Sequence, residues 1–185
     1  MDATQKVVFN TVILYLKILV TMAVSLVSVP LVLKTLGTSD YGLYNLVAGI
    51  ITMLAFLNNS MLVSSQRYMS VAMGEGKVDR INSIYNTSFI LHLSLAILIV
   101  LGLELLGVPS IEKLNIDSNR VTVAQIIFQF LIISTFSRIL SVPFDAIMNA
   151  HEDMLPFSII EFIDSILMLI VAFTLRFVLI DKLVF

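Results

Sequence analysis

The stretch YGLYNLVAGIITMLAFLNNSMLVSSQ, residues 41–66, decides the fold because it contains no charged side chain. A membrane-spanning helix needs roughly 20 consecutive, mostly apolar residues, and this stretch is longer than that. Inside a bilayer the backbone must satisfy its own hydrogen bonds, and a helix does so within one segment. We therefore expect a transmembrane helix here, covering residues 41–73.

Apolar segments of similar length flank this stretch on both sides. One precedes it and three follow it, and each is interrupted by only a few charged residues; they cover residues 7–33, 81–106, 120–148 and 154–180. Together the segments predict an all-α integral membrane bundle of about five transmembrane helices, formed by one domain over residues 1–185.

The composition agrees with a lipid solvent. Hydrophobic residues make up 58% of the chain and charged residues 13%, whereas a soluble domain carries about 25% charged residues. The mean hydropathy is +1.01. A net charge of -2 argues against nucleic acid as a partner, since few cations are present to neutralise phosphates.

Sequence motifs for chemistry are missing. The chain has no cysteine, which excludes disulfides and thiolate metal sites. It also has no glycine-rich phosphate loop, and its two histidines do not have metal-ligand spacing. We therefore expect a protein that is not an enzyme, with no catalytic residue, no metal site and no cofactor.

Polar residues recur at helical spacing inside four of the five segments. Residues three or four apart share one side of a helix, so each segment has one polar face. Such faces either meet and hydrogen-bond as helices pack, or line a watery cavity. The sequence leaves both readings open for the hydroxyl and amide residues of these faces, among them Asn10, Thr21, Ser25, Ser28, Asn45, Thr52, Asn59, Ser134, Ser141 and Ser165.

Three charges are predicted to lie deep in the membrane. Lys17, Arg138 and Asp164 each lie ten residues from one end of their segment, which is about 15 Å along a helix. That depth is near the middle of a hydrocarbon core about 30 Å thick. A lone charge there costs at least about 2.5–3.5 kcal/mol, so pairing or hydration is expected. The simpler alternatives are a snorkelling Lys17 and a structural ion pair between Arg138 and an acid of the last segment.

Several short motifs in the chain resemble those of a transporter family. The motifs are LGTSDYGLYN at residues 36–45, FLNNS at 56–60, QRY at 66–68, PFDA at 143–146 and AHEDM at 150–154. With these motifs in the same order, the chain resembles over nearly all its length the N-terminal part of bacterial polysaccharide flippases. These are the Wzx-like members of the multidrug/oligosaccharidyl-lipid/polysaccharide superfamily.

The resemblance implies a function in the bacterial cytoplasmic (inner) membrane. Wzx-like proteins move undecaprenyl-pyrophosphate-linked oligosaccharide between leaflets by alternating access. They serve the synthesis of lipopolysaccharide O-antigen, capsule or exopolysaccharide. They have two helical lobes around a cavity that is often cationic. Five spans resemble most of one lobe, so we expect an incomplete N-terminal lobe, which a second lobe or an oligomer partner would complete.

The predicted cavity residues follow from helical spacing together with the resemblance. We expect the substrate-binding cavity to contain Lys17, Arg67, Arg138, Asn59 and Thr21. By position, Lys17 and Arg67 match basic sites on cavity-facing helices of the family. The carboxylates of Glu161 and Asp164 would hold the arginine when substrate is absent, or carry H+ or Na+ as a coupling ion.

The expected partners are lipid-linked oligosaccharide and membrane lipid, with no nucleic acid. Two other functions remain open at this point. One is a cation-coupled multidrug exporter of the same superfamily, in which the carboxylates are primary. The other is a non-transporting membrane assembly subunit, in which the charges only pair helices.

Overall fold

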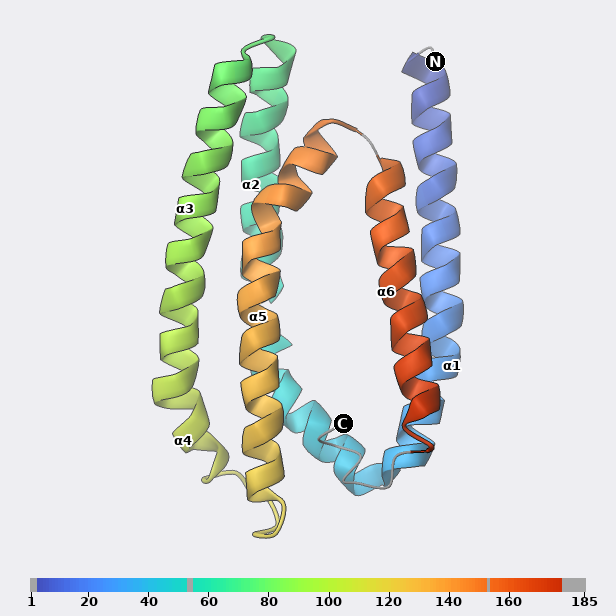
Figure 1. Cartoon of the computed structure of the whole chain (residues 1–185), viewed down its shortest axis with the longest axis vertical. Coiled ribbons are helices and arrows are strands. Elements are labelled where there is room, and N and C mark those ends of the chain that lie inside the picture. Colours follow the sequence, from blue (N-terminus) through green and yellow to red (C-terminus); the bar gives the residue numbers. More distant parts are fainter. Residues whose placement is uncertain (1–2, 53–54, 153, 178–185) are drawn as a thin grey trace. The chain divides into compact units, whose positions relative to one another are not determined.

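The computed structural model describes residues 3–52, 55–152 and 154–177, and all regular structure in these ranges is helical (Figure 1). The elements are α1 (Ala3–Thr52), α2 (Ala55–Gly74), α3 (Val78–Gly102), a π-helical turn (Leu103–Gly107), α4 (Val108–Ile111), α5 (Val121–Ala150) and α6 (Met154–Thr174). The predicted all-α fold is confirmed.

Four helices in the described ranges are long and apolar enough to cross a membrane. They are Thr4–Gly49, Val78–Ile111, Val121–Ala150 and Met154–Thr174. The chain is therefore a multi-pass membrane protein. Its described ranges contain four such helices, whereas the sequence predicts about five spans.

The difference in number comes from the first two predicted spans, 7–33 and 41–73. The loop expected between them is helical except at Gly37, where φ is 83° and ψ is 169° and α1 is kinked. Glycine adopts a positive φ without steric strain because it has no Cβ, whereas other residues rarely do so. The second span is divided between Thr38–Thr52 and α2, and its middle residues 53–54 lie outside the described ranges. Polar residues are frequent in α2, so its mean hydropathy is lower than that of the four helices named above.

The third span extends past its predicted end at residue 106. A π-helical turn, Leu103–Gly107, leads directly into α4, so the helical path reaches Ile111. Pro109 lies near the start of α4, directly after the π-helical turn. The last two helices begin within one residue of the predicted starts, 120 and 154, and α6 ends at Thr174. The predicted end at residue 180 lies outside the described ranges.

The chain forms two compact units. Unit 1 contains the described residues up to Tyr41 and those from Glu152 onward, and unit 2 contains Gly42–His151. Within unit 2, helices α2, α3 and α5 pack against one another. Phe128, Met69 and Ile139 are fully buried there. Alanines permit close approach of the helices, and those at positions 72, 96, 124 and 146 have no exposed surface.

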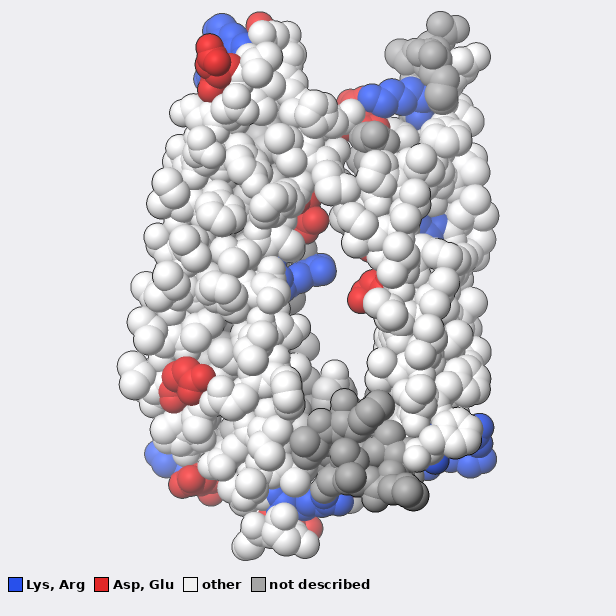
Figure 2. Space-filling view, viewed as in Figure 1, with Lys and Arg blue, Asp and Glu red and all other residues white. Residues whose placement is uncertain are grey.

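Aromatic contacts join α3 to α5 in unit 2. The Phe144 ring lies edge-on to the rings of Tyr85 and Phe89, with centroids 5.6 Å and 6.3 Å away. The outer faces of the helices are apolar, whereas charged side chains gather mainly near helix ends (Figure 2). Exposed leucines, isoleucines and valines on α1, α3 and α6 would lie in lipid.

We expect Gly107→Ala to destabilise unit 2. A Cβ at this position would lie 2.6 Å from Cζ of Phe128, a ring with no room to move because it is fully buried. Overpacking of this kind costs about 1–3 kcal/mol. Gly102→Ala is the matched control, because a Cβ there meets nothing within 4 Å. Unfolding by SDS titration of both variants in detergent checks this, and equal midpoints would contradict it.

We also expect a weak acid-dependent loss of stability at the turn between α2 and α3. Lys77 Nζ and Arg80 Nη1 lie 2.9 Å and 2.6 Å from Glu75 Oε2. The hydrogen bond from Lys77, and then the charge of Arg80, lower the pKa of the Glu75 carboxyl below its usual 4.5. A depressed folded-state pKa stabilises the fold above the unfolded pKa, and this contribution disappears as pH falls through the folded value.

The measurement is the melting temperature in detergent between pH 7 and pH 3. The wild type should lose slightly more stability below about pH 4.5 than Glu75→Gln does, because glutamine cannot titrate. Asp79→Asn, which alters another acid of the same turn, should follow the wild type. Parallel curves for the wild type and Glu75→Gln would refute the role of this ion pair.

Candidate functional site

A polar recess of about 340 Å³ lies within unit 2. Its wall comes from the end of α1, the first turns of α2 and the middle of α5, which is why the polar faces of these segments converge there. The residues that line it are Ile51, Thr52, Asn58, Asn59, Leu131, Ser134, Thr135 and Arg138. We call this the Arg138 recess.

Among the described residues that line the Arg138 recess, only Arg138 is charged. Its side chain is exposed and has no ion pair or hydrogen bond with another described residue of unit 2. A guanidinium presents several N–H donors in a planar fork that suits phosphate or carboxylate oxygens. The described lining of the recess contains no acidic residue. The recess is therefore electrostatically suited to an anion.

Neutral hydrogen-bond donors lie beside the guanidinium of Arg138. Asn58 is half-buried and Asn59 is exposed, and no hydrogen bond occupies either amide in the described part of the chain. By contrast, the hydroxyls of Thr52 and Thr135 donate to backbone oxygens of Gly49 and Leu131, at 2.9 Å and 2.8 Å. The two asparagine amides are thus the neutral groups available to a ligand, together with the Ser134 hydroxyl.

A second polar cluster lies within unit 1, between α1 and α6. Lys17 Nζ is 2.6 Å from Glu161 Oε2, and 18% of the lysine side chain is exposed. The ammonium also lies 4.7 Å from the centre of the Phe157 ring, close enough for a cation–π contact. One helical turn further on, Thr21 Oγ1 is 3.5 Å from Ser165 Oγ.

The same interface continues toward the start of α1. There Asn10 Nδ2 donates to the carbonyl oxygen of Glu152, at 2.6 Å. The polar face of the first segment therefore meets α6, and its polar groups bind across this pair of helices. For this face the structure matches the reading of hydrogen-bonding between packed helices.

The predicted site residues fall into different places. Arg138 and Asn59 share the Arg138 recess, whereas Lys17, Thr21 and Glu161 belong to the α1–α6 interface of unit 1. Arg67 is exposed on α2, outside the recess.

The two acids of α6 differ in their contacts within unit 1. Glu161 pairs with Lys17, whereas Asp164 is exposed and has no ion pair with another described residue of unit 1. That these acids hold Arg138 stays a prediction, because Arg138 belongs to unit 2. The sequence did contain a sign of the pairing of Lys17 with Glu161, but it is visible only when two helices are compared with each other. Lys17 and Thr21 are four residues apart, as are their partners Glu161 and Ser165, so two parallel helices match in register.

Helices that are long and apolar enough to cross a membrane, with few charged side chains within them, define a polytopic membrane protein. The MatE family matches residues 13–174, and the chain belongs to this family of membrane transporters in the multidrug/oligosaccharidyl-lipid/polysaccharide superfamily. No curated protein matches the chain. No solved structure matches it either.

We expect Lys17 and Glu161 to be energetically coupled. Lys17→Met or Glu161→Gln alone leaves one uncompensated charge near mid-membrane, at a cost of about 2.5–3.5 kcal/mol. The double variant leaves none, so it should be more stable than the sum of the single losses implies. A double-mutant cycle from SDS unfolding in detergent micelles measures the coupling. Strictly additive losses would show that the contact has no energetic role.

Proposed function

We propose that this chain is a flippase component that moves undecaprenyl-pyrophosphate-linked oligosaccharide across the bacterial cytoplasmic membrane. Membership of the MatE family supports membrane transport. The choice of an anionic substrate rests on one observation. The guanidinium of Arg138 has no partner among the described residues of unit 2, and no described carboxylate lines its recess. The proposed activity is transport without covalent chemistry. It would use alternating access against a second lobe or an oligomer partner.

The Arg138 recess would receive the diphosphate of the substrate. A charge-assisted hydrogen bond from arginine is roughly twice as strong as a neutral one, and it gains further strength where water is scarce. Asn58 and Asn59 would donate to the remaining phosphate oxygens or to the first sugar. The isoprenoid tail would remain among membrane lipids.

Lys17 has a different part in this proposal. Because Glu161 already neutralises it, Lys17 would take up the head group only if the carboxylate were released. Protonation of Glu161 would release it, which supplies a route for H+ as the coupling ion. Na+ binding by the acids of α6 is the other route to coupling.

The same ion pair supports a second candidate function, a cation-coupled multidrug exporter. There Glu161 would exchange Lys17 for a proton or a cationic drug, and Arg138 would be dispensable. In a non-transporting assembly subunit, by contrast, the pair would matter for stability alone. The two transport functions therefore differ in which residue is essential.

We expect Arg138→Gln to weaken binding of undecaprenyl pyrophosphate about 10- to 150-fold, because hydrogen bonds from a charged group contribute about 1.5–3 kcal/mol. Arg138→Lys should lose less, since it retains the charge but not the planar fork. Binding is measured by native mass spectrometry of the full chain in detergent. Glycan export is measured in a bacterium that lacks its own flippase and expresses the chain.

Arg176→Gln is the control, because it removes an exposed arginine of unit 1 that lies outside the Arg138 recess. It should bind as the wild type does. If Arg138→Gln binds and exports normally while Glu161→Gln abolishes drug efflux, the drug-exporter function replaces the proposal. If neither change affects any transport and only stability falls, the assembly role is correct.

A further inference from the structure

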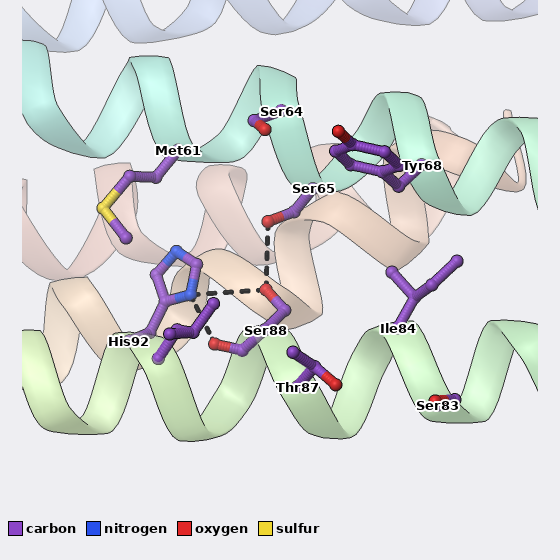
Figure 3. A pocket seen from close by; sticks show the side chains of 10 residues that line it. Met61, Ser64, Ser65, Tyr68, Ser83, Ile84, Thr87, Ser88 and His92 are labelled. Atoms are coloured by element: carbon purple, nitrogen blue, oxygen red, sulfur yellow. Dashed lines mark hydrogen bonds between the residues drawn. The ribbon is translucent and has the colours of Figure 1, made fainter.

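A second cavity lies within unit 2 between α2 and α3, with a volume of about 350 Å³ (Figure 3). This is within the usual size range of small-molecule sites. We call it the α2–α3 groove, and it is lined by Met61, Ser64, Ser65, Tyr68, Ser83, Ile84, Thr87, Ser88, Leu91 and His92. None of these residues belongs to the Arg138 recess.

The floor of the groove contains a buried imidazole with one unused nitrogen. His92 is 2% exposed, and its Nδ1 lies 2.6 Å from the Ser88 carbonyl oxygen. A carbonyl can only accept, so Nδ1 carries the hydrogen and Nε2 of the neutral ring is an acceptor. Nε2 has no partner within the described part of the chain. A buried acceptor without a donor is costly, and a ligand hydroxyl would remove that cost.

Access to this nitrogen depends on Met61. Figure 3 shows the Met61 side chain extending from α2 into the space beside the imidazole. Methionine is unbranched and changes conformation readily. On the other side of the ring, Ser88 Oγ bonds to Ser65 Oγ of α2 at 3.0 Å, which fixes the floor between the two helices.

The rim of the groove offers hydroxyls that are not in use. Ser64, Tyr68, Ser83 and Thr87 are exposed, and none of their hydroxyls has a hydrogen bond in the described ranges. In a helix such a hydroxyl usually donates to the carbonyl oxygen four residues back. Ser94, just beyond the groove on α3, does so by donating to the carbonyl oxygen of Ile90.

Polarity along the groove matches the orientation of a lipid in a bilayer. Ser83 lies five residues after Val78, the first residue of α3, and His92 fourteen residues after it, which gives depths of about 8 Å and 21 Å along the helix. Tyr68, Ser83 and Thr87 lie at the shallow end and the Met61 side chain at the deep end (Figure 3). A sugar head group would lie between Thr87 and His92, which are five residues or about 8 Å apart along α3, and its acyl chains would extend further into the bilayer.

We propose that the α2–α3 groove binds a neutral amphiphile whose head group carries several hydroxyls, such as a glycosyl diacylglycerol. Hydroxyls both donate and accept, so they match the rim, and one of them would donate to His92 Nε2 when Met61 moves aside. No charged side chain is among the described residues that line the groove, which favours a neutral head group over a phosphate. This site is independent of the transport proposal, because it shares no residue with the Arg138 recess.

The test uses the full chain in phosphatidylcholine nanodiscs that are doped with one of three probes. The probes are monoglucosyl diacylglycerol, diacylglycerol with the same acyl chains, and phosphatidylglycerol. Native mass spectrometry should show the glucosyl lipid retained at least about fivefold more than either other probe, the factor expected from one neutral hydrogen bond. Equal retention of diacylglycerol would overturn recognition of the sugar. Equal or stronger retention of phosphatidylglycerol would overturn the neutral head group.

Two variants locate the binding. Thr87→Val keeps the shape of the side chain but removes a rim hydroxyl, so retention of the glucosyl lipid should fall about fivefold. Thr11→Val is the matched control, because the Thr11 hydroxyl donates to Val7 in unit 1 and lies outside the groove. Equal losses in the two variants would refute the site. Ser83→Ala serves the same purpose if Thr87→Val does not fold.

A spectroscopic readout needs no variant. The chain has two histidines, and ¹⁵N-histidine labelling therefore gives two imidazoles, one buried at position 92 and one exposed at 151. Addition of the glucosyl lipid should shift the Nε2 resonance of His92 and leave His151 unchanged. An unchanged His92 signal at saturating lipid would show that the lipid does not reach this nitrogen.

Discussion

A polar group in hydrocarbon must find a partner, and this constraint determines how the helices of unit 1 meet. With most of its surface apolar, α1 gains little from hydrophobic burial against α6, since lipid tails are equally apolar. Lipid cannot provide a counter-charge for Lys17. Glu161 provides one, because its Oε2 lies 2.6 Å from Lys17 Nζ. The hydroxyl contact one turn away and the Asn10 contact at the start of α1 keep the same register. Specific polar contacts thus define the pairing.

Unit 2 relies on packing instead, and its polar groups have different uses. Buried alanines and the Phe144 aromatic cluster hold α2, α3 and α5 together. Polar residues are therefore free to line cavities, and two of these cavities differ in chemistry. One presents a guanidinium and amides, whereas the other presents hydroxyls and a neutral imidazole acceptor. One unit thus contains an environment suited to an anion and another suited to an uncharged polyol.

The sequence was sufficient to predict the fold class. Uninterrupted hydrophobicity predicts helices well, because length and composition alone decide whether a segment can span a bilayer. Asn59 and Arg138 were expected in one cavity from helical spacing together with the family resemblance, and both line the Arg138 recess. Spacing inside one helix cannot say which other helix a face meets, and for that reason it did not predict the pair of Lys17 with Glu161. The unused nitrogen of His92 depends on the hydrogen bond at Nδ1, which the sequence alone does not show.

The π-helical turn at Leu103–Gly107 has a consequence for how the third span tolerates changes in length. Such a turn holds one more residue than an α-helical turn, so it rotates everything beyond it relative to a regular helix. Deleting a single residue within it would restore regular winding and leave the preceding face of α3 in place. The same deletion elsewhere in α3 would rotate all residues on one side of it by about 100° about the helix axis. Natural variation in the length of this span should therefore collect at this turn.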